Sequence, residues 1–279
     1  MKKIAITGGK GGVGKSTFAI LLANKLRKEG KKVVLCDCDV ECPNDHLLLD
    51  QNLGSSTQKV YARFPKLIKE RCRKCGLCVQ NCRSNAIFQP KGGYPIFLPE
   101  LCSSCGLCWN LCPFQAIEIE KKVVGEIFLT KFQVPSSKFQ TYLVTGRAVG
   151  IVEETGPIVT ETRKFAQDFA QKVGADCLLI DTAPGMHCSV IRALIGVDLA
   201  YVVTEPTPLG AQDLRLIIRL LKLLKVPRRI VLNQADLGKR EEVEKTVEEM
   251  GVKIEYEIPY SRRIVEAYSK GKLSEVSVL

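Results

Sequence analysis

The sequence lacks three features that would place it in common protein classes. Histidine occurs only as His46 and His187, and neither has a partner at the spacing of metal ligands. No apolar stretch approaches the roughly 18 residues that a membrane-spanning helix needs. The opening MKKIAITGG reaches a glycine pair after one short apolar run, unlike a secretion signal. We therefore expect a cytoplasmic globular protein with no membrane-spanning helix.

Acidic residues are also in short supply, with 30 Asp and Glu against 41 Lys and Arg, a formal net charge of +11. Solubility is the simple explanation of this surplus, and an acidic partner protein or another polyanion is the alternative. Aromatic residues make up 6% of the chain and do not interleave with the basic ones. We therefore do not expect a nucleic-acid partner.

Cysteine, by contrast, is abundant, with 13 residues. In a secreted chain this number would indicate disulfides, whereas clustered C-x-x-C spacing in a cytoplasmic chain indicates metal. From about Phe64 to Ile119 the chain is rich in cysteine and proline and shows little helical periodicity. This segment interrupts an otherwise regular pattern of strands and helices.

The pattern on both sides of the interruption predicts the α/β class. A strand over residues 2–7, a helix from Lys15 to about Glu29 and a strand from Val33 form a βαβ unit. Later strands are predicted from Cys177 and Leu199 and within 229–236 and 252–260; later helices, at about 160–173, 211–224, 239–250 and from Ser261. The alternation predicts a doubly wound, mostly parallel sheet. We divide the chain into a first part (1–62), an insertion (63–120) and a second part (121–279).

A phosphate-binding loop joins the first strand to the first helix. GKGGVGKS at 9–16 matches G-x-x-x-x-G-K-[ST], in which backbone N–H groups and a helix N-terminus surround phosphate oxygens. We expect Lys15 to reach the β- and γ-phosphates of ATP and the Ser16 hydroxyl to ligate Mg²⁺. The predicted nucleotide-binding residues here are Gly9, Lys10, Gly11, Gly12, Val13, Gly14, Lys15, Ser16 and Thr17.

The run KGGVGKST resembles the deviant phosphate-binding loop of the MinD/ParA superfamily of P-loop ATPases, which includes the nitrogenase iron protein and the Mrp-type cluster carriers. The resemblance covers about residues 1–60 and 120–279. It implies that Lys10 contacts the nucleotide of a partner subunit, so that ATP binding draws two copies into a homodimer.

Two further motifs resemble the switches of that superfamily. CDCDVECPN, with Asp37 and Asp39, resembles the first switch, which implies that Asp39 orients the attacking water and contacts Mg²⁺ indirectly. LIDTAPG resembles the second switch, which implies that Asp181 holds Mg²⁺ through water and that Gly185 responds to the γ-phosphate. With the phosphate loop, these motifs give the expected catalytic residues Lys10, Lys15 and Asp39.

The base of the nucleotide has predicted contacts near the end of the chain. Asn233 in VLNQAD resembles the asparagine that contacts adenine in the superfamily. Pro259 and Tyr260 lie where that superfamily closes over the base.

The insertion contains two copies of one cysteine ladder, CRKCGLCVQNC from Cys72 and CSSCGLCWNLC from Cys102. Both read C-x₂-C-x₂-C-x₃-C, the run of bacterial ferredoxins with two [4Fe–4S] clusters, in which the fourth cysteine ligates the other cluster. We assign one cluster to Cys72, Cys75, Cys78 and Cys112, and the other to Cys102, Cys105, Cys108 and Cys82. Zinc bound by the same thiolates is the alternative, which the interlocked ladders disfavour.

Residues 64–119 thus resemble a small α+β bacterial ferredoxin, with one departure. Pro113 follows the second ladder, but Arg83 follows the first where proline is usual. The insertion is basic: Arg63, Lys66, Lys69, Arg71, Arg73, Lys74, Arg83 and Lys91 stand against Glu70, Glu100, Glu118 and Glu120. We therefore predict that it docks an acidic electron-carrier protein.

Five cysteines lie outside the ladders. Cys36 and Cys177 fall in apolar strands and are predicted core residues, although Cys36, Cys38 and Cys42 also allow a third metal site. Cys188 follows the second switch, where the nitrogenase iron protein has a cluster-bridging cysteine. That resemblance suggests a ligand at the dimer axis, and a buried small residue is the alternative.

The insertion separates the two switches, so nucleotide and clusters are expected to influence each other. Our leading hypothesis is an ATPase that gates electron transfer through the clusters to a redox or metallocofactor-assembly partner. The alternative is an assembly factor of the Mrp type, although such carriers use a C-x-x-C near the C-terminus that this chain lacks. A third class is spatial positioning, as in MinD and ParA, but the tail SKGKLSEVSVL is poorly patterned for a membrane-binding helix.

Overall fold

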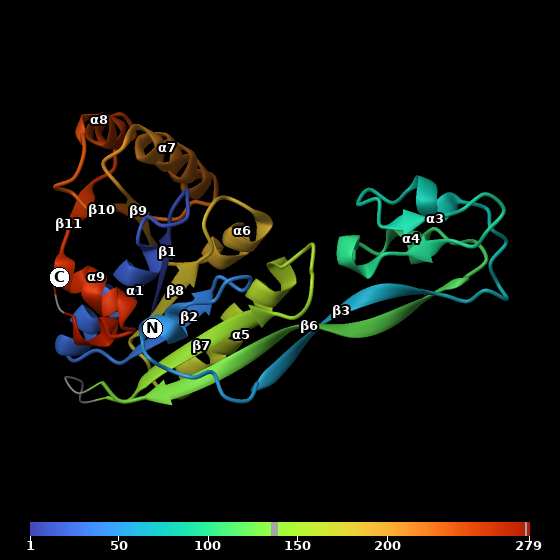
Figure 1. Cartoon of the computed structure of the whole chain (residues 1–279), viewed down its shortest axis with the longest axis horizontal. Helices are drawn as coiled ribbons and strands as arrows, with labels where there is room; N and C mark the ends of the chain where they lie inside the picture. The colour runs from blue at the N-terminus through green and yellow to red at the C-terminus, as the bar shows by residue number, and fades with distance from the viewer. Residues whose placement is uncertain (135–138, 277) are drawn as a thin grey trace.

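A long two-stranded ribbon joins a body, which holds both chain termini, to a smaller head (Figure 1). The computed structural model describes residues 1–134, 139–276 and 278–279. The ribbon consists of β3 (Gln58–Leu67) and β6 (Ile117–Phe132), which pair antiparallel. The head consists of residues 68–116, between these two strands.

The body is built on a sheet that is nine-stranded in the described part of the chain. Its order is β11-β10-β9-β1-β8-β2-β7-β6-β3. The strands from β11 to β7 are parallel, and β6 and β3 add antiparallel pairs at one edge. The remaining strands are β1 (Lys2–Thr7), β2 (Val33–Cys38), β7 (Thr141–Ala148), β8 (Cys177–Thr182), β9 (Leu199–Thr204), β10 (Arg228–Asn233) and β11 (Ile254–Ile258). The predicted mostly parallel α/β sheet is therefore confirmed.

Helices cover both faces of this sheet, which is why its central strands are buried along their whole length. Every residue of β2 and β8 is buried. One face carries α1 (Lys15–Lys28), α2 (Asp45–Leu48), α9 (Arg262–Ser269) and the short 3₁₀ helix η2 (Leu273–Glu275). The other face carries α5 (Gly156–Lys172), α6 (Cys188–Leu194), α7 (Pro208–Leu223) and α8 (Glu241–Glu249).

The head is a small unit with a repeated backbone conformation. It contains α3 (Leu77–Gln80), β4 (Ile87–Phe88), β5 (Ile96–Phe97), η1 (Pro99–Leu101) and α4 (Leu107–Asn110). Left-handed residues recur at matching places in its two halves, in the pairs Lys74 and Ser104, Gly76 and Gly106, and Asn85 and Gln115. The duplication seen in the cysteine ladders is thus also a duplication of backbone geometry.

The ribbon strands run through both of the boundaries that the sequence predicts for the insertion. β3 continues across residues 62 and 63, and β6 continues across residues 120 and 121. The division into 1–62, 63–120 and 121–279 remains our proposal. Within the residues that the structure describes, no helix combines the length and the apolar character that crossing a membrane requires.

Candidate functional site

The phosphate loop curves between the end of β1 and the start of α1. Gly14, directly before α1, has a φ of 95°, and a Cβ there would lie 2.4 Å from Nδ2 of Asn233. A Cβ on Gly9 would lie 2.4 Å from Cβ of Asp213. Gly14 is therefore required both by its left-handed backbone conformation and by the close approach of Asn233. Gly9 is required by the close approach of Asp213.

The lysine and serine at the end of the phosphate loop lie against the second switch. Lys15 is buried and donates from Nζ to the carbonyl oxygen of Lys10 at 3.1 Å. Burial lowers the pKa of Lys15, while the nearby Asp181 and Asp39 carboxylates oppose that shift. Ser16 Oγ donates to Oδ2 of Asp181 at 2.6 Å. Burial raises the pKa of Asp181 to about 7. Lys15, Ser16 and Asp181 are thus brought together at the end of the parallel strands.

The first switch is organised by Asp37. Its Oδ1 accepts the N–H of Asp39 at 3.1 Å, and its Oδ2 accepts the N–H groups of Asn44 at 3.0 Å and Asp45 at 3.1 Å. Asp39 is less enclosed, and burial raises its pKa while the Cys42 N–H and Lys15 oppose the rise. Asp37 therefore shapes the loop, whereas Asp39 is the acid that faces Lys15 from the first switch.

A pocket beside the phosphate loop gathers the predicted base-contacting residues. It is lined by Gly12, Gly14, Thr17, Asn233, Gln234, Pro259, Tyr260, Ser261, Ile264, Val265 and Tyr268. Asn233 comes from the end of β10 and donates from Nδ2 to the carbonyl oxygen of Val13 at 2.9 Å. The contact of Asn233 with adenine stays a prediction. The covering of the nucleotide base by the segment that contains Pro259 also stays a prediction.

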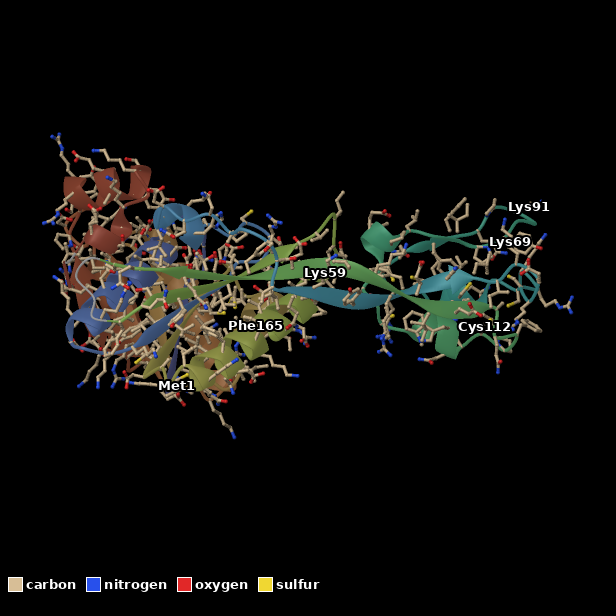
Figure 2. The ribbon with its side chains drawn as sticks, turned by 90° about the horizontal axis from the view of Figure 1, so that it is seen from below. Met1, Lys59, Lys69, Lys91, Cys112 and Phe165 are labelled. Atoms are coloured by element: carbon tan, nitrogen blue, oxygen red, sulfur yellow. The ribbon has the colours of Figure 1, made fainter. Side chains whose placement is uncertain are left out.

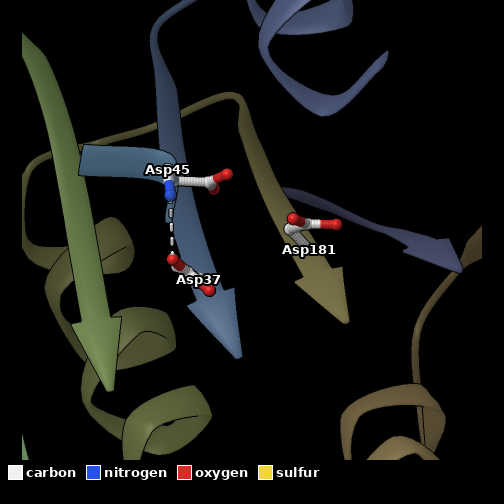
Figure 3. A group of neighbouring side chains, drawn as sticks. All are labelled: Asp37, Asp45 and Asp181. Atoms are coloured by element: carbon white, nitrogen blue, oxygen red, sulfur yellow. Dashed lines mark hydrogen bonds between the residues drawn. The ribbon is translucent and has the colours of Figure 1, made fainter. Parts of the chain in front are cut away.

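Two acidic residues that the motifs did not indicate belong to this site. Glu205 follows β9 and accepts a hydrogen bond from Lys10 Nζ at 2.5 Å. Asp45 is the first residue of α2 and lies beside Asp37 and Asp181 (Figure 3). Asp37, Asp45 and Asp181 each place one side-chain oxygen within 4.8 Å of the oxygens of the other two. The motif that ends at Asn44 gave no sign that the next residue is part of the site.

The cysteines of the head form two groups, each around its own cavity. Cys72, Cys75, Cys78 and Cys112, here called the first cysteine set, line one cavity. Cys82, Cys102, Cys105 and Cys108, the second cysteine set, line the other. Figure 2 shows Cys112 in the head, well away from Met1 and Phe165 in the body. The geometry thus combines three cysteines of each ladder with the last cysteine of the other.

The donor set in these cavities fits an iron–sulfur cluster. All eight cysteines are free thiols. Backbone N–H groups reach sulfur at 3.4 Å from Lys74 to Cys72, and at 3.3 Å from Ala86 to Cys82 and from Ala116 to Cys112. Burial raises the pKa of Cys108 to about 12, and the Cys102 thiol adds to the rise. Four thiolates are therefore compatible with such a cavity when a metal centre supplies positive charge.

The other cysteines divide into buried and exposed ones. Cys36 and Cys177 are buried, as predicted, and Cys36 Sγ lies 3.5 Å from Cys38 Sγ. Cys42 is exposed in the first switch, so the structure does not gather the three into one thiol cluster in the core. Cys188 is exposed at the start of α6, so the alternative of a buried small residue is wrong for it. A role for Cys188 at a dimer axis stays a prediction.

Comparison with known proteins identifies relatives along almost the whole chain. The CobQ/CobB/MinD/ParA nucleotide binding domain matches residues 4–274. An uncharacterized protein of Methanocaldococcus jannaschii is 34% identical over 272 residues, which cover 98% of this chain and 91% of that protein. The iron–sulfur cluster carrier protein of the same organism is 26% identical over 284 residues, covering 96% of this chain and 76% of the carrier.

Solved structures share the fold at low identity. The cell division ATPase MinD of Pyrococcus furiosus gives a TM-score of 0.55 at 18% identity, covering 98% of this chain and 89% of its own. The septum site-determining protein MinD of Pyrococcus horikoshii, complexed with Mg-ADP, gives a TM-score of 0.56 at 19% identity. The match covers 97% of this chain and 86% of that MinD chain. These similarities show that the body shares the α/β fold of those proteins.

Proposed function

Because the chain belongs to the CobQ/CobB/MinD/ParA nucleotide-binding family, we propose that it is an ATPase in which nucleotide binding controls electron transfer through two [4Fe–4S] clusters. ATP rearranges two copies of the chain as a homodimer, and each body transmits the change to its head. The head exchanges electrons with an acidic carrier and delivers them to a redox or metallocofactor-assembly partner.

A hydrogen-bonded connection between the first switch and the ribbon is the observation that carries this proposal. The carbonyl oxygen of Val40, next to Asp39, accepts the N–H of Ala148 at 2.7 Å. The following residue, Val149, donates its N–H to the carbonyl oxygen of Val124 on β6 at 2.9 Å. β6 continues as one strand to Ile117, past a shift in its pairing register with β3 between Val60 and Tyr61. Ile117 lines the cavity of the first cysteine set. A shift of the first switch can therefore reach the head through backbone contacts.

Helix α5 supplies a second connection, because the first switch and the helix that follows the second switch both contact its N-terminal part. Thr155 Oγ1, just before the helix, donates to Oε1 of Glu41 in the first switch at 3.0 Å. Arg192, on the helix that follows the second switch, donates to Thr160 Oγ1 at 3.3 Å. Ile158 packs so closely beneath β6 that a Cβ on Gly125 would lie 2.7 Å from it. Movement of the first switch, or of the helix after the second switch, can therefore displace α5, which packs against β6 of the ribbon.

The body supplies positioned charge, which is the main requirement of phosphoryl transfer. In this proposal Lys15 neutralises the β- and γ-phosphates, and Ser16 and Asp181 hold Mg²⁺. Asp39 orients the attacking water. Lys10 leaves Glu205 and contacts the nucleotide of the partner subunit.

The head supplies thiolates, each set lining a cavity that also contains apolar residues. A [4Fe–4S] cluster in each cysteine set provides one-electron transfer when bound. The N–H groups of Lys74, Ala86 and Ala116 point at ligand sulfurs and stabilise negative charge there. The basic surface of the head favours an acidic electron carrier.

Electron paramagnetic resonance on anaerobically purified protein tests the coupling. We expect the spectrum or the midpoint potential of the reduced protein to differ between nucleotide-free, ADP-bound and ATP-bound samples. The matched variant Lys15→Ala should keep its iron but lose the response to ATP. Identical redox titrations in all three nucleotide states would contradict the proposal.

Cluster delivery is the second candidate, supported by the 26% identity to an iron–sulfur cluster carrier protein. Iron content separates the two functions. A carrier transfers iron to an apo-acceptor during ATP turnover, whereas an electron-transfer protein retains all its iron and changes only its oxidation state.

A further inference from the structure

Three buried carboxylates meet at the ends of β2 and β8. Asp37 and Asp45 are 0% exposed and Asp181 is 1% exposed. Figure 3 shows that Asp45 extends from the start of α2 across β2 toward the side of Asp181. Asp37 and Asp181 are neighbours in the parallel register of β2 and β8. Three acids from three elements are therefore packed into one buried volume.

The hydrogen bonds of this group leave several oxygens unsatisfied. Asp37 accepts three backbone N–H groups, and Asp181 Oδ2 accepts the hydroxyl of Ser16. Oδ1 of Asp181 and both oxygens of Asp45 are buried without a hydrogen-bond partner among the described residues. The N–H of Asp45 donates to Asp37, which holds the backbone of Asp45 in place. The Asp45 side chain is fully buried, so water cannot satisfy its oxygens from the surface.

Buried, unpaired carboxylates need either protons or a cation. Lys15 interacts with Asp181 and Asp39, whereas the side chains with the largest electrostatic influence on Asp45 are Asp37, Asp181, Cys36 and Asp39. A cation would supply a partner for the two Asp45 oxygens, which have no hydrogen-bond partner among the described residues.

The spacing of the oxygens suits a hard divalent cation. Oxygen ligands lie about 2.0–2.1 Å from Mg²⁺ and about 2.3–2.6 Å from Ca²⁺, so ligands on opposite sides of one ion are about 4–5 Å apart. The three acids offer oxygens within 4.8 Å of one another. An all-carboxylate group favours Mg²⁺, Mn²⁺ or Ca²⁺ over softer metals.

We propose that Asp45, together with Asp37 and Asp181, binds a hard divalent cation in the absence of nucleotide. This goes beyond the Mg²⁺ that accompanies ATP, because it gives the nucleotide-free chain its own cation and assigns Asp45 as a ligand. ATP then arrives at a site where the cation is already present and Ser16 is already placed next to Asp181.

Manganese titration followed by electron paramagnetic resonance tests the proposal, because protein-bound Mn²⁺ loses the sharp signal of the free ion. The whole chain, treated with chelator and freed of nucleotide, should bind about one Mn²⁺. The variant Asp45→Asn should bind at least about tenfold more weakly, because loss of even an outer-shell partner of a metal site costs about that much affinity. Asp50→Asn is the matched control, because Asp50 is exposed near the same helix, and it should bind as the wild type does.

Thermal melting gives a readout that misfolding cannot imitate. Asp45→Asn removes a buried acid that has no partner among the described residues and should melt higher than the wild type without cation. Mn²⁺ should raise the melting temperature of the wild type and of Asp50→Asn, but not that of Asp45→Asn. Unchanged free-Mn²⁺ signals with wild-type protein, or equal binding by Asp45→Asn, would overturn the proposal. Neither measurement uses ATP or a redox change. A failure of the cation proposal can therefore be distinguished from a failure of the proposed function.

Discussion

Lys10 is paired within its own chain, although its expected partner is a nucleotide in another subunit. Its Nζ lies 2.5 Å from Oε1 of Glu205, and Thr207 Oγ1 lies 3.2 Å from the same oxygen. The two charged side chains are 29% and 20% exposed, so water partly screens their attraction. If Lys10 acts across a dimer, this ion pair must break when the dimer forms.

Replacing Glu205 should therefore make ATP-dependent dimerisation easier. A partly exposed ion pair contributes up to about 1 kcal/mol, so Glu205→Gln should tighten the dimer by up to about fivefold for each Lys10 released. Sedimentation with ATP measures this. Glu249→Gln, which removes the exposed partner of Arg215, is the control and should have no effect. Weaker dimerisation by Glu205→Gln would show instead that Glu205 contributes to the interface.

At the residue scale, contiguous motifs were predictable and tertiary neighbours were not. The phosphate loop, Asp39 and Asp181 were found because each lies in a short run with a characteristic spacing. Glu205 and Asp45 lie outside such runs, in loops or at helix starts where an acid is ordinary. Asp45 reaches Asp181 only because α2 folds back over β2, and no local pattern carries that information.

At the scale of elements, the buried strands were predictable and the ribbon was not. β1, β2, β8, β9 and β10 are short apolar runs because helices cover both of their faces. β3 and the first half of β6 are largely exposed and rich in charged residues, since they are held mainly by pairing with each other. Their sequences, QKVYARFPKL and IEIEKKVV, therefore lack the hydrophobic run that identifies a core strand.

The contact between the ribbon and α5 can be tested at Gly125. A Cβ there would lie 2.7 Å from Cγ2 of Ile158, so Gly125→Ala should destabilise the fold by about 1–3 kcal/mol through overpacking. Ile158→Ala alone should also destabilise, by about 2–5 kcal/mol. In the double variant the two costs should not add, because the alanine methyl gains room. Urea denaturation gives the free energy of unfolding of the wild type, the two single variants and the double variant. Strictly additive losses would show that the contact between residue 125 and Ile158 does not cause the destabilisation.

At the scale of the whole molecule, the pairing of cysteines in the head distinguishes interlocked ladders from independent ones. The first cysteine set contains both Cys72 and Cys112, whereas Cys102 belongs to the second. The double variant Cys72→Ser/Cys112→Ser should therefore retain about half of the cluster iron, because a single site is lost. Cys102→Ser/Cys112→Ser should retain almost none. Iron analysis and cluster spectroscopy give the answer, and independent ladders would give the reverse pattern.

The head is also electrostatically uneven, which determines where a carrier should dock. Arg73 and Lys74 line the cavity of the first cysteine set, and Lys74 Nζ lies 4.5 Å from the ring centre of Tyr94. The second cysteine set is surrounded by cysteine, serine, glycine and apolar residues. The first set also adjoins Leu67, farther along β3 from the body than Pro65, which adjoins the second. An acidic carrier should therefore approach the outer end of the head.

Stopped-flow reduction of the clusters by an acidic flavodoxin hydroquinone tests this approach. Electrostatic steering raises association rates by about tenfold or more at low ionic strength and is lost as salt screens the charges. Arg73→Gln, an exposed head residue, should slow reduction in low salt and match the wild type in high salt. Lys222→Gln, on α7 of the body, changes the net charge equally and should leave the rate unchanged. A rate that is independent of salt, or equally slowed by both variants, would place the electron carrier elsewhere on the molecule.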